Sequence, residues 1–315
     1  ILEAGEYEFF IGTDIRSAFS VGKFELSETV VKTTLEVCPP DRSFERLVND
    51  DGVLTRQMVA KGTRNIKTRI ERQIPLPLPY LKDKKYSFSE VVDGKISTED
   101  FVRTLSFDEL ETLSRGSLEG MNSSYGPTGN AAVFVATCKS LLEKGVPAIC
   151  TNDGPSGCRL QAHSTLFPIG AVLASSFNRK LIEETMSKLG EETRARRSHV
   201  LLAPGMNIHR NPLCGRNFEY FSEDPYVTSE IASAYVKGVQ KAECSAVLKH
   251  FCCNNQETGR DINNSVVSQR ALREIYLRPF EKSIKAANPD CVMTSYNKIN
   301  GLYSYYNFDF FLLSL

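Results

Sequence analysis

The chain has 315 residues, of which 41% are hydrophobic and 24% charged, a mix that can bury a globular core of about two domains. Its 38 basic and 38 acidic residues give zero net charge, which argues against a nucleic-acid-binding surface and against polybasic attachment to a membrane. No run of about 18 apolar residues occurs, so no membrane-spanning helix is predicted. The chain begins at Ile1 instead of Met, which indicates a missing upstream part and leaves a signal peptide untested.

Two β-rich stretches open the chain, at 5–12 and 24–35, and each is bounded by turn residues or alternates apolar with polar positions. Residues 38–95 change character, with Cys38-Pro39-Pro40 followed by prolines at alternate positions in 75–79. Because such prolines exclude a helix and a central strand, we predict an extended linker arm with a domain boundary here.

From residue 96 onward, helix and strand patterns alternate. Helices are predicted from the capping box at Ser106–Glu109 to Gly116, over 179–197, from Asp224-Pro225 to Val239, and over 268–284 with a kink near Pro279. Strands are predicted at 146–150, 199–203, 245–248 and 291–294. This repeated order is typical of parallel βα units, so the fold class is α/β.

Polar side chains follow each of the four predicted strands. In parallel βα folds the functional residues lie just beyond the carboxyl ends of strands, so these side chains are candidates for one site. The candidates, in chain order, are Asp153 with Arg159, then Arg216, then Lys249 with His250, and finally Tyr296. Carboxylates with Lys and Arg donors suit a ligand rich in hydroxyl groups, and no nucleophile–base pairing of the Ser-His-Asp kind is evident.

Each candidate also has a purely structural interpretation. Asp153-Gly154-Pro155 is a common turn, Arg216 could pair with Glu219 or Glu223, and Tyr296 could belong to the core or its rim. Their joint occurrence at four successive strand ends favours the site. A phosphate or dinucleotide ligand is not predicted, since no Gly-rich loop opens a helix.

Six motifs resemble glycoside hydrolase family 3 in order and spacing, over about residues 96–307. They lie at 152–159, 202–210, 215–225, 249–251, 254–257 and 293–297, and the last two are similar to the β-glucosidase branch. The resemblance implies a TIM-type (β/α)₈ barrel that hydrolyses terminal non-reducing β-D-glucosyl residues with retention, without a metal or an organic cofactor. The expected substrate is a β-glucoside or an oligosaccharide, with no nucleic-acid or membrane partner, and the oligomeric state stays open.

The resemblance also assigns roles. Asp153 would hold the 4- and 6-hydroxyls of the sugar with Arg159 at the border of the pocket, and Tyr296 would approach the ring oxygen with Met293 packed nearby. Three further residues would contact hydroxyls around the ring: Arg216, Lys249 and His250. An N-acetylglucosaminidase is disfavoured because Cys252-Cys253 follow Lys-His-Phe instead of the longer loop of that branch. A β-xylosidase, a dual-specificity glycosidase and a non-catalytic sugar-binding subunit stay as alternatives.

In that family the nucleophilic Asp follows a later strand, beyond Tyr296, and in its permuted branch the acid/base Glu lies before the barrel. We therefore expect a truncated fragment that keeps the sugar pocket and lacks both catalytic carboxyl groups. Residues 1–37 are similar to the end of a fibronectin III-like β-sandwich, 38–95 form the linker, and 96–315 form an incomplete barrel ending in an apolar stub at 308–315. About five strands are predicted, whereas a complete barrel has eight and takes about 250 residues.

Nine cysteines are scattered without a C-x-x-C pair, and the adjacent Cys252-Cys253 has poor geometry for a disulfide. Reduced and mostly buried thiols are typical of a cytosolic protein, so we expect a cytoplasmic location. No cluster of His and Cys has the spacing of a zinc site, which predicts no structural metal.

Overall fold

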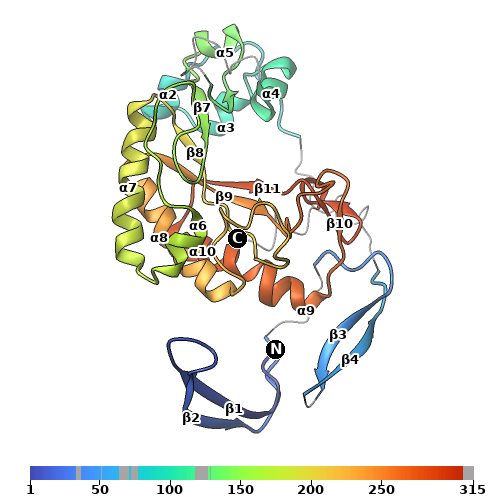
Figure 1. Cartoon of the computed structure of the whole chain (residues 1–315). Coiled ribbons are helices and arrows are strands. Elements are labelled where there is room, and N and C mark those ends of the chain that lie inside the picture. Colours follow the sequence, from blue (N-terminus) through green and yellow to red (C-terminus); the bar gives the residue numbers. More distant parts are fainter. Residues whose placement is uncertain are drawn as a thin grey trace.

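The computed structural model describes residues 1–32, 37–50, 52–63, 71, 77–117, 127 and 129–307. A six-stranded sheet forms the centre, with long helices along one side and two separate hairpins near the N-terminus (Figure 1). In the described part of the chain, no helix has both the length and the apolar character needed to cross a bilayer.

The central sheet has the strand order β11-β9-β8-β7-β6-β5. Its members are β5 (Gly116–Ser117), β6 (Ala132–Val135), β7 (Ala148–Asp153), β8 (Val200–Leu202), β9 (Ser245–Phe251) and β11 (Cys291–Thr294). Strands β7, β8, β9 and β11 are parallel, as predicted, and correspond to half of a (β/α)₈ barrel. Strands β5 and β6 continue the sheet in antiparallel orientation and were not predicted.

Two long helices pack against the sheet at β8 and β9. They are α7 (Arg179–Ala195) and α8 (Pro225–Lys241), and each begins where a side chain caps it, Asn178 accepting from Leu181 N and Asp224 from Val227 N. The helices cross closely because Gly190 and Gly238 lack side chains, since a Cβ on either would overlap the partner helix. Both predicted helices are confirmed to within two residues at their ends.

The helix predicted over 268–284 consists of three pieces. These are α9 (Gln269–Ala271), a π-helical turn η2 (Leu272–Tyr276) and α10 (Arg278–Ala287). In the π turn the amide of Leu277 donates to the carbonyl of Leu272 at 2.8 Å. The interruption predicted near Pro279 is therefore present, because a proline has no amide proton and its ring displaces the carbonyl one turn earlier.

The first predicted strand is confirmed as β1 (Gly5–Ile11), which pairs with β2 (Phe19–Leu26) in an antiparallel hairpin. The second strand thus lies earlier than the predicted 24–35, of which residues 33–36 lie outside the described residues. The apolar side chains of this hairpin are largely exposed, Phe10 by 60%. A two-stranded hairpin does not by itself define a fibronectin-like sandwich.

The prediction of a purely extended arm over 38–95 is wrong. The segment contains a second hairpin, β3 (Phe44–Asp50) with β4 (Val53–Val59), and a short helix α2 (Phe88–Val92). The missed signal is the turn between the strands, where Gly52 adopts φ +86 and its amide donates to Oδ1 of Asn49. Residues 77–80 do lack helix and strand, and 72–76 lie outside the described residues.

The remaining elements are short. They are α3 (Thr98–Val102), α4 (Phe107–Ser114), α5 (Lys139–Glu143), α6 (Gly170–Ser175), the three-stranded sheet β10 (Asn264–Ser265), β12 (Lys298–Ile299) and β13 (Leu302–Tyr303), and the 3₁₀ turn η3 (Ser304–Tyr306). The predicted capping box before α4 is confirmed, with Ser106 accepting from Glu109 N and Glu109 accepting from Ser106 N. The helix ends before Gly116, as predicted, with Arg115 as its C-cap, and Gly116 begins β5.

The main hydrophobic core lies between the sheet and helices α7 and α8, and a smaller cluster surrounds Phe101 and Leu141. Val37 and Cys38 are fully buried in the main core, so the predicted boundary between 1–37 and 38–95 packs against the barrel. All nine cysteines lie within the described residues, and no two of them form a disulfide. Burial raises the pKa of the Cys244 thiol to about 12.

Candidate functional site

Asp153 is the last residue of β7, and a tight loop follows it. The amide of Arg159 donates to the carbonyl oxygen of Asp153 at 2.9 Å and to Oδ1 of Asn152 at 3.0 Å, which closes this loop. Gly154 adopts φ +126, and a Cβ there would overlap the carbonyl oxygen of Gly157. Only glycine fits this backbone, so the local sequence holds the Asp153 carboxylate at the carboxyl end of the strand.

Lys249 on β9 is paired with Asp153, although 96 residues separate the two. Its side chain is 3% exposed, and Nζ donates to Asp153 Oδ1 at 2.8 Å. Burial would raise the pKa of Asp153, but the charge and hydrogen bond of Lys249 outweigh it, with help from Arg159, and hold the pKa below 3.8. Asp153 is therefore a carboxylate at neutral pH, available to accept hydrogen bonds from a ligand.

Arg216 lies in the loop between β8 and α8 and is surrounded by carboxylates. It forms an ion pair with Glu219, and its terminal nitrogen lies 4.0 Å from Oε1 of Glu257. Burial lowers the pKa of Arg216, but neighbouring Tyr220, Glu219 and Glu257 raise it overall. The structural alternative foreseen for Arg216, a pair with Glu219, is thus present.

His250 follows Lys249 and is buried. Its Nδ1 lies 3.3 Å from the Tyr220 hydroxyl and 3.2 Å from Oδ1 of Asn207. Burial lowers the pKa of His250 well below 6.5, and the charges of Arg216 and Lys249 lower it further. The imidazole is therefore neutral near pH 7, and a neutral imidazole has one nitrogen that donates and one that accepts.

Tyr296 and Met293 occupy the neighbouring strand end. Met293 on β11 pairs in register with Lys249 on β9, and the rings of Tyr296 and His250 have centroids 6.2 Å apart. The guanidinium of Arg260 lies 4.2 Å from the centre of the Tyr296 ring, a cation–π contact. Tyr296 is 43% exposed, so it does not belong to the core.

The carboxyl ends of β7, β9 and β11 thus bring together Asp153, Lys249, His250 and Met293. Tyr220 connects Arg216 to His250, and the ring of Tyr296 lies directly beside that of His250. Arg159 is the least integrated candidate, with a side chain that is 80% exposed and one contact to Asp153 at 3.4 Å. The grouping combines the ionised carboxylate of Asp153, the cations of Lys249 and Arg216, and the neutral imidazole of His250. Such a set can donate and accept hydrogen bonds in fixed directions, as a polyhydroxylated ligand requires.

Two residues with clear positioning contacts were not predicted. Asn207 binds the main chain of His250 on both sides, accepting from His250 N and donating to His250 O at 2.9 Å each. Asn254 donates to both the Tyr220 hydroxyl and Glu257 at 3.2 Å. Both lie within the motifs at 202–210 and 254–257, so their presence in those motifs was the available signal.

Within the described residues, no group of three or more His, Cys, Asp or Glu side chains is arranged to hold a metal ion. The polar grouping lies instead at the strand ends of a half-barrel. A family model, the glycosyl hydrolase family 3 N terminal domain, matches residues 109–304, and the chain belongs to this family. The predicted family is therefore confirmed.

Similar proteins are named as β-glucosidases. The β-glucosidase of Ruminococcus albus is 43% identical over 310 residues, which are 98% of this chain and 32% of that protein. Thermostable β-glucosidase B of Acetivibrio thermocellus is 48% identical over 177 residues, 52% of this chain and 23% of that protein. The chain thus spans about a third or less of these two relatives.

Solved structures agree in fold. A β-glucosidase from Paenibacillus barengoltzii superposes with a TM-score of 0.90 at 43% identity, over 98% of this chain and 34% of that one. β-Glucosidase 3B from Thermotoga neapolitana, in complex with glucose, superposes with a TM-score of 0.61 at 44% identity, over 65% of this chain and 30% of that one. The described half-barrel is accordingly part of a TIM-barrel-like fold.

Proposed function

We propose that this chain supplies the glucosyl-binding side of a retaining β-glucosidase that acts on terminal non-reducing β-D-glucosyl residues. The observation that carries the proposal is the buried Lys249 on β9 paired with Asp153 at the carboxyl end of β7. A carboxylate so oriented can accept from two hydroxyls, while Lys249 donates to a third group. The solved relative from Thermotoga neapolitana binds glucose, which supports the same class of ligand here.

The proposed binding residues are the seven that the sequence analysis assigned. They are Asp153, Arg159, Arg216, Lys249, His250, Met293 and Tyr296. The neutral His250 would form one hydrogen bond with a ring hydroxyl. Glu219 holds Arg216 in place to donate to another hydroxyl of the sugar. Tyr296 would contribute an aromatic face against the sugar ring.

Turnover needs more than this set. A retaining glycosidase uses two carboxyl groups about 5–5.5 Å apart, one of which must be protonated to act as the acid. Asp153, Glu219 and Glu257 each form an ion pair with a cation, and although burial would raise the pKa of Asp153, Lys249 and Arg159 lower it. We therefore propose that these three carboxylates bind and orient, and that the chain binds sugar without hydrolysing it.

Calorimetric titration of the 315-residue chain with D-glucose tests the binding proposal. Asp153→Asn is expected to weaken glucose binding at least tenfold, because a charge-assisted acceptor is lost. The matched control is Asp93→Asn, which removes an exposed carboxylate paired with Lys95. Equal affinity of the wild type and Asp153→Asn would contradict the proposal, provided circular dichroism shows both folded.

Two further measurements separate the alternatives. D-Xylose lacks the 6-hydroxymethyl group that Asp153 would hold and keeps the 4-hydroxyl, so xylose binding should be weaker than glucose binding and should be weakened less by Asp153→Asn. Equal affinities for the two sugars would favour a β-xylosidase or a dual-specificity enzyme. Hydrolysis of 4-nitrophenyl β-D-glucoside at a rate comparable to that of an intact β-glucosidase would refute the assignment of the three carboxylates to binding alone.

The hairpin β1–β2 supports a proposal about domain organisation. Its exposed apolar residues, such as Phe10 and Ile11, need a partner surface. This fits the C-terminal part of a fibronectin III-like sandwich over 1–37, joined through 38–95 to a barrel unit over 96–315. Limited proteolysis should then release a stable fragment that begins within 38–95. Cleavage first inside the barrel unit would contradict this division.

A further inference from the structure

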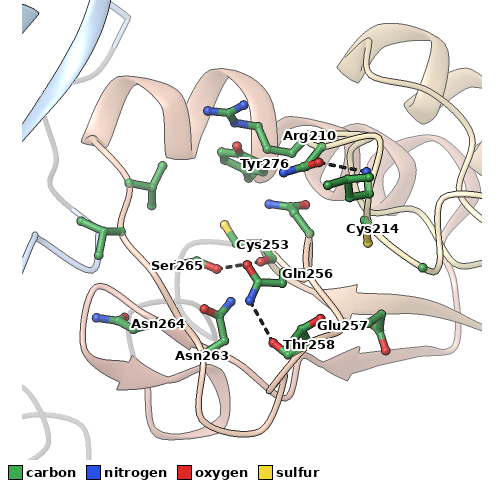
Figure 2. Close-up of a pocket in the computed structure, with 16 residues that line it drawn as sticks. Arg210, Cys214, Cys253, Gln256, Glu257, Thr258, Asn263, Asn264, Ser265 and Tyr276 are labelled. Atoms are coloured by element: carbon green, nitrogen blue, oxygen red, sulfur yellow. Dashed lines mark hydrogen bonds between the residues drawn. The ribbon is translucent and has the colours of Figure 1, made fainter.

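A polar cavity borders the loops after β8 and β9 (Figure 2). Its volume is about 670 Å³, within the range of about 300–1,000 Å³ typical of small-molecule sites. The walls come from the loop after β8, from the loop after β9, from the segment 263–267 and from Tyr276. None of the seven proposed glucosyl-binding residues is among the described residues that line the cavity. Glu257 lines the cavity and also lies close to Arg216, one of those seven.

Side-chain amides dominate the polar lining of this cavity. Five amides contribute, together with two aliphatic hydroxyls: Asn211, Asn255, Gln256, Asn263, Asn264, Thr258 and Ser265. The charged residues on the lining, Arg210 and Glu257, are opposite in sign, so the cavity has no excess charge to select an ion. Amides both donate and accept, which matches the hydroxyl groups of a neutral polyol.

Some of these polar groups are unsatisfied within the described structure. Asn255 Oδ1 is buried and has no hydrogen-bond partner among the described residues. Asn263 uses its main chain, donating to Gly259 O and accepting from Lys298 N, both at 2.8 Å, while no described residue bonds its side chain. By contrast, Gln256 donates to Thr258 O at 2.9 Å and Ser265 to Cys253 O at 2.9 Å (Figure 2). Asn255 and Asn263 are thus the groups available to a ligand.

Apolar groups complete the lining. Val266, Val267 and the ring of Tyr276 border the cavity, and Val267 and Tyr276 are almost fully buried. A saccharide presents both hydroxyls and C–H faces, so a site with amides and apolar side chains can bind both kinds of surface.

We propose that this cavity is a second binding site for a neutral saccharide of one or two hexose units, separate from the glucosyl site at Asp153. The site is built from the loops after β8 and β9, with Asn255 and Asn263 as its polar contacts. It does not depend on the chemistry proposed for Asp153.

Calorimetric titration with cellobiose tests the second site. The wild-type chain should bind two molecules, and Asn255→Leu/Asn263→Ala should reduce the stoichiometry to one. In the Asp153→Asn chain one site should persist, and adding the double substitution should weaken it at least tenfold. The control is Gln161→Leu, an exposed amide that does not line the cavity. Asn255→Leu removes an oxygen that lacks a partner, so the variant should fold as well as the wild type.

The outcomes distinguish the two proposals. Cellobiose binding that is unchanged by Asn255→Leu/Asn263→Ala, in both the wild-type and the Asp153→Asn background, would overturn the second site alone. Glucose affinity unchanged by Asp153→Asn would overturn the glucosyl site alone. Inorganic phosphate that displaces cellobiose from the Asp153→Asn chain would overturn the assignment to a neutral ligand. If Asp153→Asn fails to fold, the change in stoichiometry in the wild-type background decides.

Discussion

The pairing of Asp153 with Lys249 should contribute measurably to stability as well as to binding. Asp153→Asn removes one charge of the pair and leaves the Lys249 ammonium, 3% exposed, without its counter-charge. At an N–O distance of 2.8 Å and an effective dielectric constant of about 20, the gross attraction is about 332/(20 × 2.8), or about 6 kcal/mol. Removing one partner of a fully buried pair costs about 3–5 kcal/mol.

The expected loss lies at the lower end of that range. The Asp153 side chain is 34% exposed, so water can approach the vacated position, and the Asn oxygen can still accept from Lys249. We expect the free energy of unfolding to fall by about 3 kcal/mol. Urea unfolding followed by far-ultraviolet circular dichroism measures it, since the chain has no Trp for fluorescence.

Arg159→Ala is the matched control, because Arg159 also contacts Asp153 but its side chain is 80% exposed. Its effect should stay within about 0.5 kcal/mol. Adding Lys249→Met to Asp153→Asn should recover part of the loss, because the uncompensated charge disappears. A loss below about 1 kcal/mol for Asp153→Asn, or an equal loss for Arg159→Ala, would refute the reasoning from burial.

Two further predictions concern the Asp153 loop and His250. Gly154→Ala should lower the free energy of unfolding by about 2 kcal/mol or more and weaken glucose binding, because a Cβ would overlap Gly157 O. The control is Gly22→Ala, whose Cβ meets open space. Equal melting temperatures of the two variants would contradict this prediction. His250 has a folded-state pKa well below 6.5, so the unfolded chain gains its proton first and stability should fall as the pH drops below 6.5, by about 1.4 kcal/mol per pH unit for one proton. The free energy of unfolding, measured with urea at pH 7.0 and 5.5, should differ less between the two pH values for His250→Gln than for the wild type. The control His163→Gln replaces an exposed histidine and should match the wild type. A pH difference for His250→Gln as large as that of the wild type would contradict this prediction.

Local chemistry explains which elements could be predicted. The N-terminus of α8 follows from Asp224-Pro225 alone, since a capping carboxylate and a proline at the first position act within one turn. The hairpin β3–β4 escaped prediction because the prolines around it dominated the pattern, although the Gly52 turn was visible. The antiparallel strand β6 escaped because its pairing with β7 depends on residues distant in the chain.

The sequence by itself determined the family, the order of the parallel βα units and the six motifs that hold the candidate residues, because these depend on residue types at short spacings. Only the tertiary structure decided that Lys249 neutralises Asp153 across 96 residues and that His250 is neutral. The same is true of the amide-lined cavity between two loops. Strand register and burial create these features, and a charge or an amide acquires its role only from the groups that folding places around it.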